Sequence, residues 1–338
     1  MTDSDLPVGK LPPALLERLL AGAPTDPSVV IGPGIGLDCA VVDIGDRLLV
    51  LKSDPVTFVT DDLGRYLVQV NLNDLATTGA VPRWLLVTLL LPDGRTSAAC
   101  ADGIMETVYG LCREYGIAVV GGHTEITHGL DRPVASAALI GEVARDRLIT
   151  PRGARPGDRV LLTKGVPIEG ASILAREFPD RLRPLLGEEG LARARDLLAD
   201  PGIGVLEDAR TALAAGRVSA MHDPTEGGVA AALWELARAS GRSLSIRVAA
   251  IPVPELCARI CGAFHIDPLE TIASGALLLT APEPDARRIT AALEAAGIPC
   301  ADIGAVGEGP AGVRRADDGQ ALPWPERDGI ARAFERDT

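Results

Sequence analysis

Aromatic side chains are scarce in this chain, since Phe, Trp and Tyr together make up 3% of its 338 residues. Apolar residues nonetheless make up 47%, so the composition excludes a disordered chain and predicts cores of aliphatic side chains. Long apolar runs are lacking: Trp84–Leu91 is broken by Thr88 and is far shorter than the roughly 20 residues that cross a bilayer. The first residues, MTDSDLPVGK, are acidic and lack the apolar core of a signal peptide. A protein outside the membrane is expected.

Positive charge is also in deficit, with 33 Lys and Arg against 46 Asp and Glu and a net charge of −13. This balance argues against nucleic-acid binding, which needs clustered basic side chains. Six cysteines are scattered without the paired spacing of zinc sites or a neighbouring His cluster. We interpret them as reduced core thiols of a cytoplasmic protein. They are Cys39, Cys100, Cys112, Cys257, Cys261 and Cys300.

A glycine-rich segment, GPGIG, places Gly32, Gly34 and Gly36 in one short stretch. A dinucleotide-binding fold would need a helix directly after it, but the following residues predict a hairpin of Ala40–Ile44 and Leu48–Leu51. A P-loop is excluded because no Gly-Lys-Ser/Thr follows. Two interpretations stay open: a flexible loop whose amides close over phosphates, or a tight turn between a helix and a strand.

Two polar side chains stand out in the otherwise apolar helix predicted at Leu63–Thr78. Asn71 and Asp74 are three residues apart and therefore share one face of that helix. A buried polar pair is costly unless it is hydrogen-bonded or coordinates a cation; a solvated surface pair is the alternative. Asp54 follows the predicted strand Leu48–Lys52 and is a further candidate ligand, although Asp before Pro also caps turns.

The motif GGHTE follows a predicted strand at Ile117–Val120, which would put its polar residues at the carboxyl end of that strand. Glu125 there is a candidate Mg²⁺ ligand. His123 could contact substrate or phosphate, or be a plain hydrogen-bonding loop residue.

A second motif, HDPTEGG at His222–Gly228, precedes the helix predicted at Glu226–Ser240. Thr225 is the expected N-cap, and Gly227 and Gly228 are expected to leave backbone amides open to an anion. Capping explains the threonine but not two glycines in a first helical turn, where they cost stability. The pattern favours a binding function.

The Pro- and Gly-rich stretch Pro151–Asp158 is the best domain boundary. It predicts domains at 1–150 and 151–338, each mixing strands with covering helices. The segment after Pro310 is charged and weakly patterned, so no element is predicted there.

Several blocks, over about residues 8–310, resemble the AIR synthase (PurM-like) superfamily and most of all its HypE branch of hydrogenase-maturation and AIR synthase-related proteins. They are GLDCAVVDIGD, LKSDPV, VNLNDLATTGAVP, VVGGHTEIT, PGDRVLLTKG, IEGASILA and HDPTEGGVAAAL. The resemblance implies an α/β (α+β) fold of two domains. The N-terminal domain, 1–150, would bind ATP and pair its sheet with that of a second copy in a homodimer, while 151–338 would form a mixed α/β domain.

The resemblance also implies ATP and Mg²⁺ as cofactors and an enzyme that phosphorylates a carbonyl or amide oxygen of a small substrate or carbamoyl group. In HypE this activation dehydrates a carbamoyl thioester-like group during hydrogenase maturation, so maturation-factor partners are expected too. The implied catalytic residues are Asp74, His123 and His222; the metal ligands are Asp38, Asp54, Asp74 and Glu125. The implied cofactor-binding residues are Gly32, Gly34, Gly36, Asn71, Asp223, Thr225, Glu226, Gly227 and Gly228.

The sequence departs from HypE at two points. HypE proteins end in a cysteine that carries the carbamoyl group, whereas this chain ends in AFERDT and its last cysteine is Cys300, so a free substrate is expected. Many relatives carry an acid where His123 stands; either Glu125 would supply that carboxylate two residues later, or metal binding would be weaker. A non-catalytic, nucleotide-binding maturation or scaffold protein remains the alternative. The triad of Asp38, Asp54 and Asp74 favours the enzyme, because converging carboxylates repel one another without a cation.

Overall fold

The computed structural model describes residues 11, 13–57, 59 and 61–335, which form two compact units. The N-terminal unit comprises residues 26–32 and 38–148. The C-terminal unit comprises the chain from residue 149 onward together with described residues before 26 and residues 33–37. The sequence did not predict that these two early segments join the second unit.

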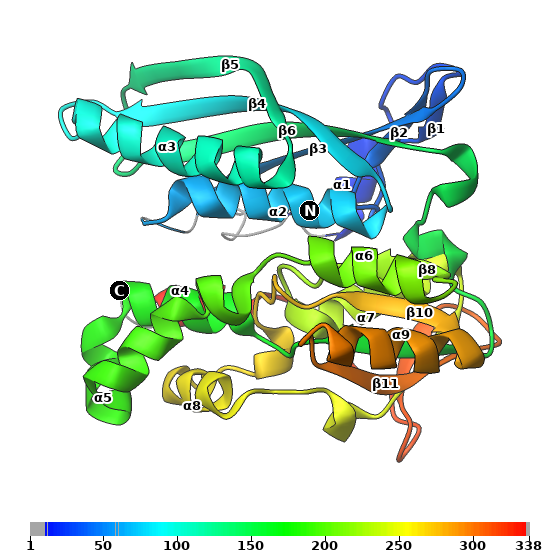
Figure 1. Ribbon diagram of the computed structural model, residues 1–338. Coiled ribbons are helices and arrows are strands. Elements are labelled where there is room, and N and C mark those ends of the chain that lie inside the picture. The colour runs from blue at the N-terminus through cyan, green and yellow to red at the C-terminus, as the bar shows by residue number, and fades with distance from the viewer. Residues whose placement is uncertain (1–10, 12, 58, 60, 336–338) are drawn as a thin grey trace. The chain divides into compact units, whose positions relative to one another are not determined.

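The N-terminal unit is built on a mixed six-stranded sheet (Figure 1). Neighbouring strands are antiparallel except for the last pair, which is parallel. In spatial order the strands are β1 (Val29–Ile31), β2 (Ala40–Asp43), β3 (Leu48–Val56), β6 (Val134–Val143), β4 (Val81–Pro92) and β5 (Ala118–Thr127). The predicted hairpin is confirmed as β2 and β3, which turn at Gly45 with a φ of 105°.

Two helices, α2 (Leu63–Thr77) and α3 (Ala98–Tyr115), cover one face of this sheet (Figure 1). Ser97 caps α3 by accepting from the amide of Cys100, and Gly116 ends it in the left-handed conformation that favours glycine. The helix predicted at Leu63–Thr78 is confirmed as α2. Its polar residues Asn71 and Asp74 are buried, which excludes the solvated surface pair.

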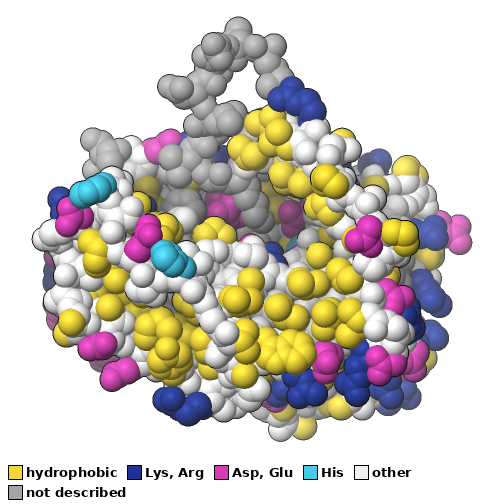
Figure 2. Space-filling model, turned by 90° about the horizontal axis from the view of Figure 1, so that it is seen from above, with side chains coloured by type: hydrophobic (Ala, Val, Ile, Leu, Met, Phe, Trp, Pro, Cys, Tyr) yellow, Lys and Arg dark blue, Asp and Glu magenta, His cyan; other side chains and the backbone are white. Residues whose placement is uncertain are grey.

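The other face of the sheet carries no helix of the described chain and is largely apolar. Hydrophobic side chains gather on the surface seen from that side in Figure 2. Alternation along the strands places partly exposed Leu51, Trp84, Leu86, Leu90 and Ile140 on it. A sheet face of this composition is typical of a surface that packs on another sheet.

The C-terminal unit contains a second six-stranded sheet. Its strands, in spatial order, are β12 (Gly312–Arg315), β9 (Ser243–Ile246), β11 (Cys300–Gly307), β7 (Asp158–Thr163), β10 (Leu278–Pro282) and β8 (Ala220–His222). α7 (Gly228–Ser240) packs on the face that carries Val160 and Leu162, in a core of aliphatic side chains. α6 (Leu206–Ala215) and α9 (Glu283–Ala295) pack together, with α9 against the opposite face of β7 at Leu161.

The remaining helices of this unit are α1 (Pro13–Leu20), α4 (Ile168–Glu177), α5 (Pro179–Asp196), α8 (Glu255–Phe264) and α10 (Gly329–Glu335). β12 and α10 lie in the segment after Pro310, where the sequence predicted no element. The ring of Phe334 in α10 lies 5.0 Å from that of Phe178, in an edge-to-face contact. The described part of this segment, up to Glu335, is thus part of the packed unit.

The cysteines are all free, which agrees with the predicted reduced thiols. Four are buried, and burial raises the pKa of Cys257 and Cys261 to about 12. Cys100, on α3, is exposed, so the prediction of a core thiol was wrong for this cysteine. None of the described helices is both long and apolar enough to cross a membrane.

Candidate active site

β3 and α2 bring a lysine and two carboxylates together in the N-terminal unit. Lys52 and Asp54 are two residues apart on β3, so both project from the face that α2 covers. The Nζ of Lys52 lies 3.1 Å from Oδ2 of Asp54 and 3.1 Å from Oδ2 of Asp74. The two predicted metal ligands therefore converge on one cation, which is the lysine ammonium.

Two further polar side chains hold this cluster in place. Asn71 accepts a hydrogen bond from the backbone N–H of Asp54 at 2.9 Å and donates to the carbonyl of Leu67 at 2.9 Å. Thr77 Oγ1 lies 3.2 Å from Oδ2 of Asp38, which brings the third predicted carboxylate to the end of the same helix. Asn71 thus fixes the strand that carries Asp54, and Thr77 orients Asp38.

The charge of Lys52 balances the carboxylates. Burial opposes its ammonium form, but Asp74, Asp54 and Asp38 outweigh burial and raise the pKa of Lys52 above its ordinary value. Three carboxylates around one positive charge are the hard oxygen donors that Mg²⁺ takes in proteins, so these side chains fit that ion. Sequence reasoning missed Lys52, although its spacing from Asp54 on a strand was the available signal.

The strand prediction at GGHTE was wrong, because β5 does not end at Val120 but continues to Thr127. Val119 pairs with Leu85 and Gly121 pairs with Leu86, so Val120 is an extra residue in a bulge. A Cβ on Gly122 would lie 1.8 Å from the carbonyl oxygen of Val87. The paired glycines therefore let an edge strand pass close to β4, rather than ending it.

The sheet register separates His123 and Glu125 from the Lys52 cluster. His123 pairs with Thr88, which pairs with Ser136 and then with Pro55, so it lies three strands, or about 14 Å, from β3. Pro55 neighbours Asp54 and points to the opposite face of the sheet. Within the N-terminal unit the structure thus does not bring these two residues to the carboxylates, and their metal and substrate roles stay predictions.

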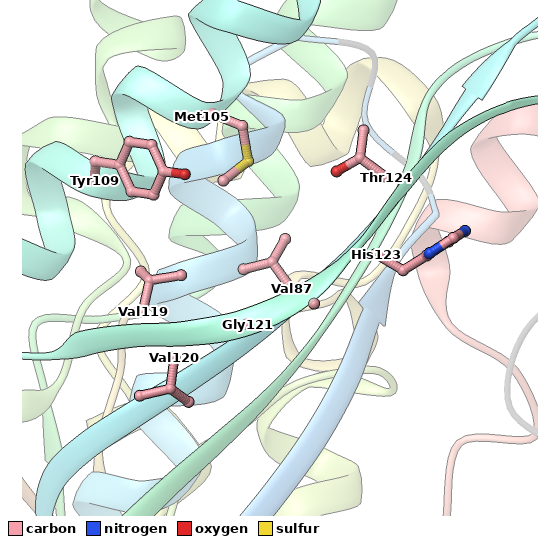
Figure 3. A pocket seen from close by; sticks show the side chains of 9 residues that line it. Val87, Met105, Tyr109, Val119, Val120, Gly121, His123 and Thr124 are labelled. Atoms are coloured by element: carbon pink, nitrogen blue, oxygen red, sulfur yellow. The ribbon is translucent and has the colours of Figure 1, made fainter.

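On β5 the two side chains face each other instead. His123 Nε2 lies 2.9 Å from Glu125 Oε2, and both side chains are exposed, at 65% and 47%. Beside them is an open hollow of about 430 Å³ between β5 and α3, lined by Val87, Met105, Tyr109, Val119 and Thr124 among others (Figure 3). In Figure 3 Thr124 points toward α3, whereas His123 points away from it.

In the C-terminal unit the HDPTEGG motif joins β8 to α7. His222 ends β8, and its Nε2 lies 2.8 Å from Oε2 of Glu235 on α7. Gly36, with a φ of 70°, approaches the same point, because a Cβ there would lie 3.0 Å from the carbonyl oxygen of Glu235. The absence of a helix after the GPGIG segment is confirmed, and Gly36 is explained by this close approach.

Two expectations for the motif were wrong. Thr225 is not the N-cap: Gly227 takes that position, with a φ of 81°, and α7 begins at Gly228. The amides are not open to an anion either, since Gly227 N–H donates to Asp328 Oδ2 at 2.5 Å and Gly228 N–H donates to the carbonyl of Thr225 at 2.9 Å. A Cβ on Gly228 would lie 2.5 Å from the carbonyl oxygen of Leu269, so packing explains this glycine.

Two acids near the motif, the buried Glu169 and the half-buried Asp328, were missed by the sequence analysis. Burial raises the pKa of Glu169, in the first turn of α4, to about 7, against hydrogen bonds from Ser274 that lower it. Burial also raises the pKa of Asp328 to about 6, and hydrogen bonds from three backbone amides oppose the rise. The charge of Glu226 adds to both shifts, so this carboxylate lies near both acids.

Comparison with known proteins supplies the family. A model of the AIR synthase related protein N-terminal domain matches residues 36–143, and a model of the corresponding C-terminal domain matches residues 155–317. The chain belongs to the AIR synthase related family. This confirms the resemblance seen in the sequence.

The proteins to which the chain is similar include hydrogenase-maturation proteins. A putative hydrogenase expression/formation protein of Methanocaldococcus jannaschii is 29% identical, over 76% of each chain. Carbamoyl dehydratase HypE of Azotobacter vinelandii is 32% identical, over 71% of this chain and 68% of its own length. A solved structure of the hydrogenase maturation protein HypE in complex with ATP is 25% identical, with a TM-score of 0.71 over 94% of this chain and 91% of that one. The predicted two-domain, PurM-like fold is thereby confirmed.

Proposed function

We propose that this AIR synthase related protein is an enzyme that uses ATP and Mg²⁺ to phosphorylate a carbonyl or amide oxygen of a small substrate or carbamoyl group. Such an activation serves the maturation of a metallocentre of the hydrogenase kind, together with partner maturation factors. The observation that carries the proposal is the convergence of Asp38, Asp54 and Asp74 around Lys52. The likeness to a carbamoyl dehydratase and to a HypE that binds ATP supports it.

The side chains of the cluster have separate tasks in this proposal. Asp38, Asp54 and Asp74 hold Mg²⁺, which when bound neutralises charge on the nucleotide phosphates. Lys52 keeps its proton next to the carboxylates and offers a positive charge to phosphate oxygens. Phosphoryl transfer needs little more from a protein than positioning and charge neutralisation, which is what a fixed set of charges provides.

Several other predicted residues contact the nucleotide or substrate in this proposal. The loop with Gly32, Gly34 and Gly36 covers the phosphates, and the polar residues of HDPTEGG contact nucleotide or substrate. His222 is held by Glu235, which fixes its ring and makes it the proton-transferring candidate of the C-terminal unit. His123 and Glu125 are exposed and remain candidates for contacts with the phosphate-accepting substrate.

Calorimetric titration of ATP, with and without Mg²⁺, tests the nucleotide site. We expect binding by the wild type to require Mg²⁺, and Asp74→Asn to weaken it at least about tenfold, because a charge-assisted contact is worth about 1.5–3 kcal/mol. Asp46→Asn, an exposed change on the β2–β3 turn, is the control. A folded wild type that binds no ATP would contradict the proposal. If Asp74→Asn binds ATP with the same affinity as the wild type, Asp74 is not part of the site.

A non-catalytic scaffold is the second candidate, and the apolar outer face of the N-terminal sheet favours a role in protein contacts. The same Asp74→Asn variant separates the two functions. An enzyme loses turnover of ATP with its substrate, whereas a scaffold keeps its partner binding unchanged.

We also propose that this outer face pairs with a second copy of the chain. Leu86→Asp puts a charge in the middle of the apolar face, where burial against a partner would be costly. Size-exclusion chromatography with light scattering should show the mass fall from that of two chains to that of one, 35.1 kDa. Leu185→Asp, at an exposed position of α5, should leave the mass unchanged. A wild type that already elutes as one chain would exclude the homodimer.

A further inference from the structure

The last described segment of the chain, residues 322–335, returns to the start of α7 and is called the latch segment below. Its first contact is at Leu322, a core residue whose carbonyl accepts a hydrogen bond from Trp234 Nε1 at 2.8 Å. The ring of Trp324 lies 6.1 Å from that of Trp234, and the guanidinium of Arg238 lies 5.6 Å from the ring of Trp324. These contacts run along the outer part of α7.

The next contact reaches the HDPTEGG loop itself. The carboxylate of Asp328 accepts from Gly227 N–H with one oxygen and from Ile330 N–H, at 2.7 Å, with the other. The backbone of Ile272 donates to it as well. An anion at the N-terminus of a helix is favoured by the free amides and by the helix dipole. Here a side chain of the chain's own latch segment takes that place.

Close packing supports the hydrogen bonds. A Cβ on Gly227 would lie 3.3 Å from Pro325 of the latch segment. A Cβ on Gly329 would meet Thr271 Oγ1. Arg332 donates to Glu270 at 3.2 Å. The stretch 269–271 therefore lies in contact with the latch segment and, through Gly228, with the HDPTEGG loop.

We propose that the latch segment positions the HDPTEGG loop for catalysis and that Asp328 is its positioning residue. In this proposal Asp328 acts through the amide of Gly227 on the residues that precede it, Asp223 to Glu226, rather than by contact with nucleotide or substrate. The catalytic consequence rests on the proposed function, whereas the control of loop order does not.

Substitutions of Asp328 by Ala and by Asn remove different parts of its hydrogen bonding. Asp328→Ala removes the acceptor and leaves the Gly227 N–H without its partner. Asp328→Asn keeps one oxygen that can accept from Gly227 and loses the charge, so it should restore much of the order. Glu326→Gln, at an exposed position two residues away, is the matched control.

Amide hydrogen exchange of the nucleotide-free, full-length chain tests the proposal directly. In Asp328→Ala we expect exchange in the peptide over 222–230 to speed up by about tenfold or more, the size expected for a lost charged hydrogen bond. Exchange in the β7 and β10 peptides should stay at the wild-type rate. Asp328→Asn should lie between the two, and Glu326→Gln should match the wild type.

Kinetic measurements then distinguish a positioning role of Asp328 from a contribution to protein stability alone. With a turnover assay, Asp328→Ala should lower kcat with little change in the KM for ATP, and Asp328→Asn should recover part of kcat. If the wild type turns over no ATP, the proposed function fails. The hydrogen-exchange result still decides whether the latch segment orders the HDPTEGG loop. Unchanged exchange over 222–230 in a folded Asp328→Ala would overturn the inference. So would an exchange increase spread equally over the whole unit.

Discussion

Gly228→Ala is expected to lower the free energy of unfolding by about 3 kcal/mol or more. The residue has a φ of 63°, and a left-handed conformation costs a residue with a side chain roughly 1–2 kcal/mol. Its new Cβ would also lie 2.5–2.8 Å from three backbone atoms, the carbonyl oxygens of Leu269 and Thr271 and the amide nitrogen of Thr271. Backbone cannot rotate away as a side chain can, so overpacking adds about 1–3 kcal/mol.

Urea denaturation at constant pH checks this expectation through the midpoint, with the slope serving as the test of a two-state transition. Gly110→Ala is the control, since a Cβ there has no described atom within 4 Å and the residue lies inside α3. That change should stabilise the protein by about 0.5–1 kcal/mol. If Gly228→Ala is as stable as the wild type, packing does not require this glycine. The predicted role in anion binding would then again explain its presence.

Glu169→Gln is expected to change how stability depends on pH. The carboxyl is 3% exposed, and burial raises its pKa from 4.5 to about 7. A raised pKa in the folded state means that the contribution of Glu169 to stability is fully present below pH 4.5 and is lost as pH rises through 7. The loss amounts to about 3 kcal/mol, at 1.36 kcal/mol for each pKa unit.

The Gln variant cannot ionise and still offers an oxygen to the Ser274 N–H, which donates to Glu169 at 3.1 Å. Its unfolding free energy, relative to that of the wild type, should therefore rise by about 3 kcal/mol between pH 4.5 and pH 8. Glu189→Gln, on the exposed part of α5, should show no such rise. A constant difference across the range would mean that Glu169 ionises in the folded protein as easily as in the unfolded chain.

Much of the N-terminal unit is predictable because local signals there agree with tertiary packing. Gly116 stops α3 where the apolar periodicity ends, and the Gly45 turn sets the register of β2 and β3. β5 was mispredicted because two glycines normally end a strand, whereas here they accommodate a bulge against Val87. That distinction depends on how closely a neighbouring strand approaches, which no local pattern contains.

The carboxylates of the candidate site were recognisable from the sequence, but their partner was not. Lys52 in an apolar strand looks like a solvated edge residue until α2 is known to cover that face of β3. Glu169 and Asp328 had still weaker signals, since Glu169 opens a helix where acids are common and Asp328 lies in a weakly patterned segment. Their burial is set by long-range packing of α4, α7 and the latch segment.

The distribution of thiols allows one cysteine to be labelled selectively for spectroscopy. Burial raises the pKa of Cys112 and Cys300 to about 11, as it does that of Cys257 and Cys261 to about 12, which keeps these thiols protonated and slow to react at neutral pH. Cys39 is buried, whereas Cys100 lies exposed at the start of α3. A maleimide dye should therefore attach first at Cys100 in the natural sequence. One label per chain would then report by energy transfer whether two chains associate.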